Sequence, residues 1–315
     1  MRSYDALVIV SFGGPEGPDD VMPFLRNVVR GRNVPEDRLQ LVAERYQRFG
    51  GVSPINAQTR ELVDAVRVEI PELAVYWGNR NWHPFLADTL ADMTAAGVER
   101  ALAFVTSAYS SYSSCRQYLE DIDSARAAVG AGAPIVDKIP PFCAHQGFIE
   151  ANRDRLHAAL SQLAAERPTV FFTAHSLPES MAATCDYADE LNRTAARVLD
   201  RDLDSRLVYQ SRSGPPSVPW LGPDVLDALR EVRDNGVTDV VIAPIGFVSD
   251  HLEVIYDLDV EARDLAAELG MRLVRAKTVG VHPRFIRMIR ELVESPSAAC
   301  EPSCCPAPQR ERSET

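Results

Sequence analysis

The sequence has no surplus of positive charge. It carries 33 Lys and Arg against 45 Asp and Glu, so the formal net charge is −12 with its 6 His neutral. Proteins that bind nucleic acids present basic surfaces to the phosphates, so this balance argues against a nucleic-acid partner. With 46% hydrophobic and 25% charged residues, the composition is that of a globular protein, and 315 residues suggest about two domains.

Long apolar runs are also missing. No run approaches the ~20 apolar residues that a membrane-spanning helix needs. The apolar stretch Ala6–Val10 is too short and wrongly flanked for a signal peptide. We therefore expect a cytoplasmic protein without a transmembrane segment.

Cysteine is scarce and unevenly placed. Of the six cysteines, Cys300, Cys304 and Cys305 crowd into the last sixteen residues. This is not the even spread of a disulfide framework. In a reducing compartment, such a group of thiols indicates a metal site. The tail that holds them has no hydrophobic periodicity, so we expect it to be disordered unless something ties it down.

Short β-rich runs alternate with longer segments of helical period, and this order is typical of parallel sheets covered by helices. In the second half the runs begin about 33 to 37 residues apart, the length of one strand plus its crossover helix. We predict an α/β fold of two doubly wound parallel-sheet (Rossmann-like) domains. The predicted strands are 6–11, 73–77 and 101–105 in the first half, and 169–173, 206–210, 239–243 and 272–276 in the second.

The domain boundaries follow from composition. Segment 130–141 is rich in Gly, Ala and Pro and is the best candidate for a linker. The two halves begin alike, with a strand, a turn and a proline, which is weak evidence for a duplication. We assign residues 1–138 to a first domain, 139–282 to a second and 296–315 to a Cys-rich tail, and we expect helix 283–295 and the tail to return to the first domain.

Two familiar motifs are absent where they would be expected. The turn Gly13-Gly14-Pro15-Glu16-Gly17 follows the first strand but fits neither G-x-G-x-x-G nor a P-loop, and Pro15 lacks a backbone donor for phosphate. Ser176 lacks the flanking glycines of a nucleophile elbow. The sequence therefore favours neither a nucleotide-binding loop nor a serine hydrolase.

Polar side chains follow two strands of the second half. His175 stands just beyond run 169–173, and His251 and Glu253 follow run 239–243 after a short loop. In an open parallel sheet, ligands bind outside the carboxyl ends of the strands. We therefore expect these side chains to face one another across one crevice.

An acidic row begins at the same place. Glu253, Asp257 and Glu261 recur every four residues, so they share one face of a helix. A solvated acidic face is the usual meaning of such a row. Here basic partners are missing at the intervening i+4 positions, and a bound cation would offset the repulsion.

Six segments, in one order, resemble the signature segments of ferrochelatases, and they cover the chain from the first strand to about Pro283. They are Ser11-Phe-Gly-Gly-Pro-Glu, Arg45-Tyr-Gln-Arg-Phe-Gly-Gly-Val-Ser-Pro-Ile, Tyr109-Ser-Ser-Tyr-Ser-Ser, Thr173-Ala-His-Ser-Leu-Pro, Tyr209-Gln-Ser-Arg-Ser-Gly-Pro and Pro244-Ile-Gly-Phe-Val-Ser-Asp-His-Leu-Glu-Val-Ile-Tyr-Asp-Leu-Asp. The resemblance implies a chelatase-like fold and the insertion of ferrous iron into a porphyrin in haem synthesis.

The resemblance also implies roles for the residues at the strand ends. His175 would bind iron or take a pyrrole proton as a neutral imidazole, and Glu253 would act as a base or metal ligand on the other side. Asp257 and Glu261 would lead iron inward or protons outward through their hard oxygen ligands.

Substrate binding is expected on the first half, because porphyrin propionates need cations and hydroxyls. The residues that resemble the family's substrate edge are Phe12, Arg30, Arg32, Arg45, Tyr46, Ser53 and Tyr109. The arginines, the lack of an apolar extension and a likeness to the actinobacterial branch of the family favour coproporphyrin III over protoporphyrin IX. Phe12 weighs against this choice, because some relatives that use coproporphyrin carry a tyrosine there.

The tail Cys300-Glu-Pro-Ser-Cys304-Cys305-Pro resembles the iron-sulfur tail of some ferrochelatases. This implies a 2Fe–2S cluster held by the tail cysteines and one internal cysteine. We predict Cys143 as the fourth ligand, because Cys115 and Cys185 lie in helical patterns typical of buried small side chains. Structural zinc is the main alternative.

Two other functions remain alternatives to iron insertion. One is a cobalt or nickel chelatase for another tetrapyrrole, and the other is a porphyrin or haem carrier without turnover. A peripheral contact with a membrane or with a neighbouring pathway enzyme is also left open.

Overall fold

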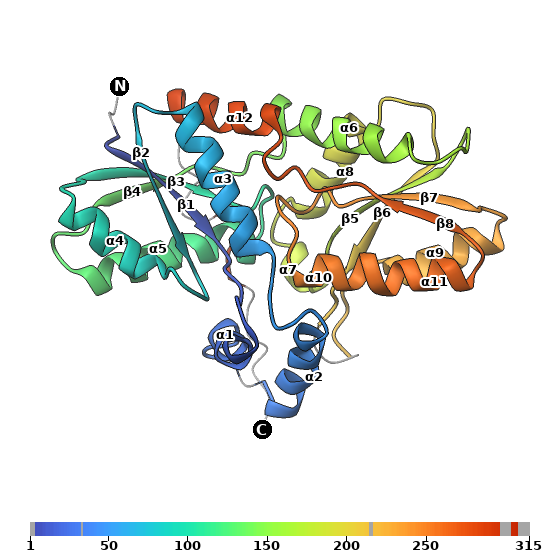
Figure 1. The fold of residues 1–315 in the computed structure, drawn as a ribbon, viewed down its shortest axis with the longest axis horizontal. Helices are drawn as coiled ribbons and strands as arrows, with labels where there is room; N and C mark the ends of the chain where they lie inside the picture. Colours follow the sequence, from blue (N-terminus) through green and yellow to red (C-terminus); the bar gives the residue numbers. More distant parts are fainter. Residues whose placement is uncertain (1–3, 33, 214–216, 297–303, 308–315) are drawn as a thin grey trace.

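The computed structural model describes residues 4–32, 34–213, 217–296 and 304–307. Two four-stranded sheets lie side by side, and every pairing within them is parallel (Figure 1). This confirms the predicted fold class. The strands are β1 Ala6–Ser11, β2 Ala74–Asn79, β3 Arg100–Val105 and β4 Ile135–Lys138 in the first sheet, and β5 Thr169–His175, β6 Ser205–Gln210, β7 Asp239–Ala243 and β8 Arg272–Arg275 in the second.

Helices cover both faces of each sheet (Figure 1). Those before β5 are the 3-10 turn η1 Pro18–Asp20, α1 Val21–Val28, α2 Glu36–Gln47, α3 Ile55–Glu69, α4 Leu86–Ala95, the π-helix η2 Tyr112–Arg116, α5 Gln117–Val129 and α6 Gln146–Leu160. Those after β5 are α7 Glu179–Ala182, α8 Tyr187–Val198, α9 Val225–Asp234, α10 Leu252–Val254, the π-helix η3 Ile255–Ala262, α11 Arg263–Glu268 and α12 Pro283–Glu294. Elements α10, η3 and α11 follow one another without a break.

The two sheets have the same topology. Their strand orders, β2-β1-β3-β4 and β6-β5-β7-β8, correspond strand for strand. In each sheet the chain reverses its direction of winding between two central strands, β1 and β3 or β5 and β7. Such a switch point opens a crevice at the carboxyl ends of those strands, where ligands bind in open α/β sheets.

The segment predicted as a linker contains a strand. Residues Ile135–Lys138 form β4, which pairs with β3 at the edge of the first sheet. The strand is short, and Ile135 is half exposed, so its apolar signal is weak beside the surrounding Gly, Ala and Pro. The linker assignment was therefore wrong at its centre. The boundary at 138/139 stays a prediction.

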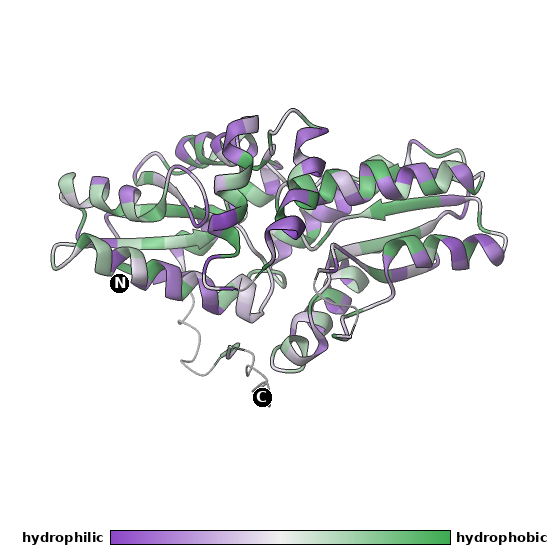
Figure 2. Ribbon diagram, turned by 90° about the horizontal axis from the view of Figure 1, so that it is seen from below, coloured by the Kyte–Doolittle hydropathy of each residue, from purple (hydrophilic) through white to green (hydrophobic). Residues whose placement is uncertain are grey.

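The largest hydrophobic cluster belongs to both sheets. Alternate residues of β1 and β5 point into it, among them Ile9 and Phe172, and it is covered by α3, α6, α8 and α12. The opposite faces pack separately against α4 and α5 in the first sheet and against α9, η3 and α11 in the second. Figure 2 shows the hydrophobic residues gathered on the strands between the helical layers.

Helices α1 and α2 stand apart from the two sheets and project from one side of the molecule (Figure 1). They form a small cluster of their own around Phe24, Leu39 and Tyr46, and Leu252 of α10 enters this cluster from the second half. At the other side of the molecule, α12 packs against α3 and α6. Within the described residues, no helix is both long and apolar enough to cross a membrane.

Candidate active site

His175 and Glu253 lie where the topology opens a crevice. His175 is the last residue of β5, and Glu253 lies in α10, after the loop that leaves the neighbouring strand β7. The Glu253 carboxylate oxygen Oε2 is 3.6 Å from His175 Nε2. The side chains are 34% and 49% exposed, so both reach solvent or a ligand. The structure thus brings together the pair that the sequence placed at two strand ends.

The His175 imidazole has a defined orientation. Its Nδ1 lies 2.5 Å from the Ser176 carbonyl oxygen. A carbonyl can only accept a hydrogen bond, so Nδ1 carries a proton and donates it. Nε2 is then the nitrogen that faces Glu253 and has a lone pair in the neutral ring. It can accept a proton or bind a metal.

His251 is a third member of this group. It packs against the Phe247 ring, with 5.1 Å between the ring centroids. Burial lowers the pKa of His251, and His175 lowers it further, while Glu253 and Asp250 oppose the shift. Two imidazoles and one carboxylate therefore share this end of the second sheet.

The acidic row continues from Glu253 into the π-helix η3. Asp257 is buried, and Ser211 Oγ donates a hydrogen bond to its Oδ2. Burial, with the nearby charges of Glu253 and Glu261, raises the pKa of Asp257 to about 7 against the opposing effects of Ser211 and Arg45. The three acids are thus close enough to interact, as the spacing predicted. The helix around them is wider than an α-helix, a form that often marks functional sites.

A pocket of about 130 Å³ opens beside Asp257 and Glu261. Ser211 and Arg45 also line it, so it joins the second half to α2 of the first. Gln210 contributes a buried amide, which lies 3.5 Å from the Asp257 carboxylate through Nε2 and leaves its Oε1 without a hydrogen bond. The pocket is therefore polar and acidic.

Phe12 and Tyr46 form one apolar wall near the crevice. Phe12 follows β1 and contacts Phe24 edge-on, and Phe24 contacts the Tyr46 ring in the same way. Tyr46 is buried, and burial together with the charge of Glu253 raises its pKa well above the usual value. Tyr46 therefore lies near the acid of the second half.

The three arginines of the predicted substrate edge do not form one group. Arg30 and Arg32 are exposed in the segment after α1, and Arg30 donates to Asn27 Oδ1 at 2.6 Å. The guanidinium of Arg45 instead lies over the Tyr256 ring, 4.6 Å from its centroid, beside the acidic row. The sequence predicted these residues at one edge, but Arg45 faces η3.

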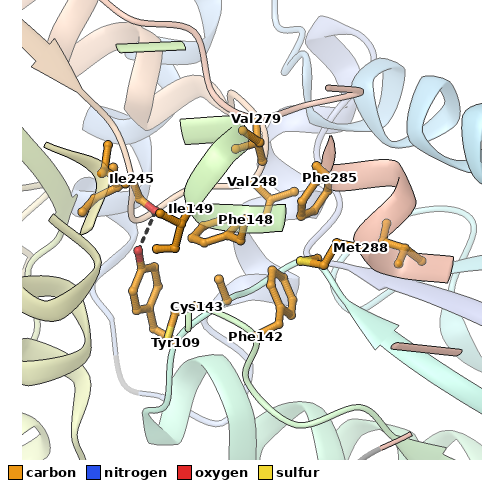
Figure 3. Close-up of a cluster of buried hydrophobic side chains, with 14 of the residues drawn as sticks. Tyr109, Phe142, Cys143, Phe148, Ile149, Ile245, Val248, Val279, Phe285 and Met288 are labelled. Atoms are coloured by element: carbon orange, nitrogen blue, oxygen red, sulfur yellow. Dashed lines mark hydrogen bonds between the residues drawn. The ribbon is translucent and has the colours of Figure 1, made fainter. Parts of the chain in front are cut away.

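Tyr109 and Ser53, both predicted at the substrate edge, are buried. Tyr109 is 1% exposed, and its hydroxyl donates to the Ile245 carbonyl oxygen at 3.0 Å (Figure 3). Ser53 is 3% exposed, and its backbone N–H donates to the Pro15 carbonyl. In this structure Tyr109 links the two halves and Ser53 supports the turn after β1.

The family of the chain follows from comparison with known proteins. The family model "Ferrochelatase" matches residues 4–297. The chain belongs to the ferrochelatase family. It is 53% identical to a protein of Rhodopirellula baltica named ferrochelatase, over 93% of this chain and 86% of that one. It is also 53% identical to a protein of Frankia alni named coproporphyrin III ferrochelatase, over 92% of this chain and 79% of that one.

Structural comparison agrees on the fold. SirB from Bacillus subtilis, solved with Fe³⁺, matches 92% of this ferrochelatase-family chain and 96% of its own, with a TM-score of 0.59 and 10% identity. At this identity, the likeness extends to the fold alone. Together with the family match, it confirms the predicted chelatase-like fold and the predicted class of enzyme, a metal-inserting porphyrin chelatase.

The described part of the ferrochelatase tail lies against η2. The Sγ atoms of Cys304 and Cys305 are 3.4 Å apart, and Arg116 donates to the Cys304 carbonyl through Nε at 3.0 Å and Nη2 at 2.7 Å. A hydrogen bond with Cys115, burial and the neighbouring Cys304 all raise the pKa of the Cys305 thiol. Cys300 lies outside the described residues, and no group of three metal-binding side chains is assembled within them.

Cys143, the predicted fourth cluster ligand, lies elsewhere. It is buried in the shared core close to Tyr109 (Figure 3). Burial raises the pKa of Cys143 to about 12, and Glu190 adds to the shift. Cys115 is hydrogen-bonded to Cys305 of the tail, and Cys185 lies near Cys304; the sequence analysis set both aside. No local signal could have shown this, because the contact joins positions 115 and 305.

Proposed function

We propose that this protein inserts ferrous iron into coproporphyrin III. The observation that carries the proposal is the pairing of His175 Nε2 with the Glu253 carboxylate at 3.6 Å, at the switch point of a ferrochelatase-family fold. The acidic row behind Glu253 offers hard oxygen ligands of the kind that dehydrated divalent cations prefer. A carrier without turnover would have no use for that row.

The reaction requires the protein to accept protons. Iron takes the place of two pyrrole protons, so the porphyrin loses two protons for each Fe²⁺ that it gains. His175 Nε2 is the acceptor for one, because the hydrogen bond from Nδ1 to Ser176 fixes the lone pair toward the crevice. Glu253 is the acceptor or first iron ligand on its other side. Asp257, with a pKa of about 7 caused mainly by burial, passes protons toward the pocket.

Arg30 and Arg32 are the proposed partners of the porphyrin propionates. Both are exposed just after α1, and Val28 and Val29, which precede them, pack in the cluster that holds Phe12 and Tyr46. A planar macrocycle can pack against an apolar wall while its carboxylates meet guanidinium groups at the edge. Four propionates gain more from this edge than two, and the relative from Frankia alni bears the name of a coproporphyrin III ferrochelatase.

The test is an insertion assay without oxygen. The protein is incubated with ferrous iron and either coproporphyrin III or protoporphyrin IX under identical low-detergent conditions, and metalation is followed by absorbance. We expect a higher kcat/KM for coproporphyrin III. A preference for protoporphyrin IX would contradict the substrate, a preference for cobalt or nickel would contradict the metal, and tight binding without metalation would mean a carrier.

We also propose that the tail holds a 2Fe–2S cluster, with Cys115, Cys300, Cys304 and Cys305 as ligands. Four thiolates suit such a cluster. Support comes from the position of the Cys305 thiol, which lies 3.4 Å from Cys304 Sγ and is hydrogen-bonded to Cys115. When bound, the cluster supplies the cross-link that holds the tail against η2. Cys143 takes no part, since its described contacts are in the core.

Single Cys→Ser variants test this ligand set. Cys115→Ser and Cys304→Ser should each lose the reddish colour and the iron and sulfide content of protein purified without oxygen. Cys143→Ser is the matched control and should keep both. If Cys143→Ser lost the cluster and Cys115→Ser kept it, the fourth ligand would be Cys143, as predicted from the sequence. A colourless protein with stoichiometric zinc would identify a structural zinc site.

A further inference from the structure

One guanidinium group is bonded to two carboxylates of the segment that carries the acidic row. Arg275, the last residue of β8, is bonded to Asp259 through Nε and Nη2, both at 2.7 Å. It is bonded to Asp250 through Nη1 at 3.1 Å and Nη2 at 3.3 Å, and Nη1 also donates to the Ala276 carbonyl at 3.3 Å. These five bonds match the five N–H donors of an arginine.

The two carboxylates lie close in sequence to the residues of the candidate active site. Asp250 directly precedes His251 and lies three residues before Glu253, and Asp259 lies in η3 between Asp257 and Glu261. The side chains of Arg275, Asp250 and Asp259 are only 13%, 16% and 29% exposed. An ion pair shielded from water is rigid and expensive to break, unlike the exposed pairs elsewhere on the surface.

The same segment is held on its opposite side by the first half. The Asp250 backbone N–H donates to Gln58 Oε1 of α3 at 2.8 Å. Leu252 is buried in the cluster of α1 and α2, and Tyr256 lies beneath the Arg45 guanidinium. The loop and π-helix are therefore fixed between α1–α3 and β8.

We propose that Arg275 is a positioning residue for metal insertion: its two-carboxylate grip sets the placement of Glu253 and the acidic row opposite His175. This inference rests on the proposed function. Arg275 contributes nothing to porphyrin binding in this account, because its side chain is turned to Asp250 and Asp259. A displacement of about 1 Å in such a site can cost ~100-fold in rate.

Arg275→Lys is the main test. Lysine keeps the charge but has three donors on one nitrogen, so it cannot hold both carboxylates in the same geometry. We expect kcat to fall about 10- to 100-fold while KM for the porphyrin stays within about twofold. Hydrogen exchange of the amides in 250–262 should become faster, while that of β1 and α3 stays unchanged.

Arg272→Lys is the matched control. Arg272 lies at the start of the same strand, is 59% exposed and pairs with Asp239. It should retain wild-type kcat and wild-type exchange in 250–262. If Arg275→Lys fails to fold, the triple variant Arg275→Met/Asp250→Asn/Asp259→Asn replaces all three shielded charges by uncharged side chains, and the same fall in kcat is expected from it.

The outcomes separate this inference from the proposed function. A wild-type kcat in a folded Arg275 variant, or a loss of porphyrin affinity that accounts for the whole defect, would overturn the positioning role. If the wild-type protein itself inserts no iron, the proposed function fails. Unchanged exchange in 250–262 would show that Arg275 does not hold this segment, whatever the reaction.

Discussion

At the residue scale, the orientation of His175 is set by one backbone contact. The bond from Nδ1 to the Ser176 carbonyl leaves Nε2 as the reactive nitrogen, and Tyr187 donates to the His175 carbonyl at 3.0 Å. The ring and its backbone are thus both held before any substrate arrives. Catalytic groups that are fixed in advance need little rearrangement in the transition state.

His175→Ala should abolish turnover without abolishing binding. Removal of a positioned base commonly costs ~100-fold or more in rate. Porphyrin affinity, measured by fluorescence quenching, should remain close to that of the wild type because the proposed substrate edge lies in the first half. His157→Ala is the control, since His157 pairs with Asp200 on the surface. Near-normal insertion by His175→Ala would rule out the assignment.

Asp257 makes stability depend on pH. Burial raises its pKa from 3.8 to about 7, so in this range the folded protein holds a proton that the unfolded chain has lost. The free energy of unfolding therefore falls as pH rises from about 3.8 to about 7, and the full destabilisation by Asp257 is reached above about pH 7.

Asp257→Asn should remove this penalty. The difference in free energy of unfolding between variant and wild type should shift in favour of the variant by about 2 kcal/mol between about pH 5 and about pH 8. Urea titrations at each pH measure this difference. Asp64→Asn, at a residue whose side chain is 73% exposed, is the control. A difference between variant and wild type that does not change with pH would contradict the buried-acid account.

At the element scale, the loop after β7 lies directly on β5. A Cβ added at Gly246 would be 2.6 Å from Ala174 Cα, and the Gly246 N–H donates to the Thr173 carbonyl at 3.0 Å. The loop that leads to Glu253 is therefore seated on the strand that ends in His175. Only a glycine allows this approach.

Gly246→Ala should disturb both stability and catalysis. Overpacking of this kind costs about 1–3 kcal/mol, and the displaced loop should lower kcat. Gly17→Ala is the control, because nothing lies within 4 Å of a Cβ added there. Thermal unfolding and the insertion assay together check the prediction, and an active variant with wild-type Tm would show that the loop adapts.

The sequence predicted the strands well because their signals are local. Buried parallel strands such as β1, β5 and β7 are continuous apolar runs, and the structure has each of them within two residues of the predicted ends. Strand β4 was missed because four residues with a half-exposed isoleucine carry little signal. The π-helices were missed because the same spacing of acids fits an α-helix equally well.

The candidate site was predictable only in part. His175, Glu253 and the acidic row follow strands or a helix, so topology alone brings them together. The contacts of Arg275, Ser211 and Cys115 are with residues far away in the sequence. No local sequence pattern could therefore predict them. The motif that predicted Tyr109 at the substrate edge did not reveal the hydrogen bond from its hydroxyl to the Ile245 carbonyl.

At the scale of the whole molecule, the shared hydrophobic cluster makes the two sheets one folding unit. Phe285 of α12 is fully buried. Its ring contacts Phe104 of the first sheet edge-on and lies tilted against Phe142 and Phe148, within the cluster that also holds β5 and β7 residues. Neither half can keep this cluster from water without the other.

Unfolding should therefore show one transition. Circular dichroism and the fluorescence of Trp77, Trp82 and Trp220, which sample both halves, should give coincident curves. Phe285→Ala should lower the free energy of unfolding by about 3–5 kcal/mol, and the curves from the two probes should shift together. Separate transitions for the two halves would mean that the shared cluster does not couple them.

The same cluster limits the motion of the two sheets relative to each other. A hinge between the sheets would separate the packing around Tyr109 and Ile245 (Figure 3), so we expect the two sheets to move as one rigid body. Helices α1 and α2 have their own small cluster, joined to the second half mainly through Leu252. If a flat, rigid substrate needs a motion to enter, we therefore expect it in α1 and α2 and not between the two sheets.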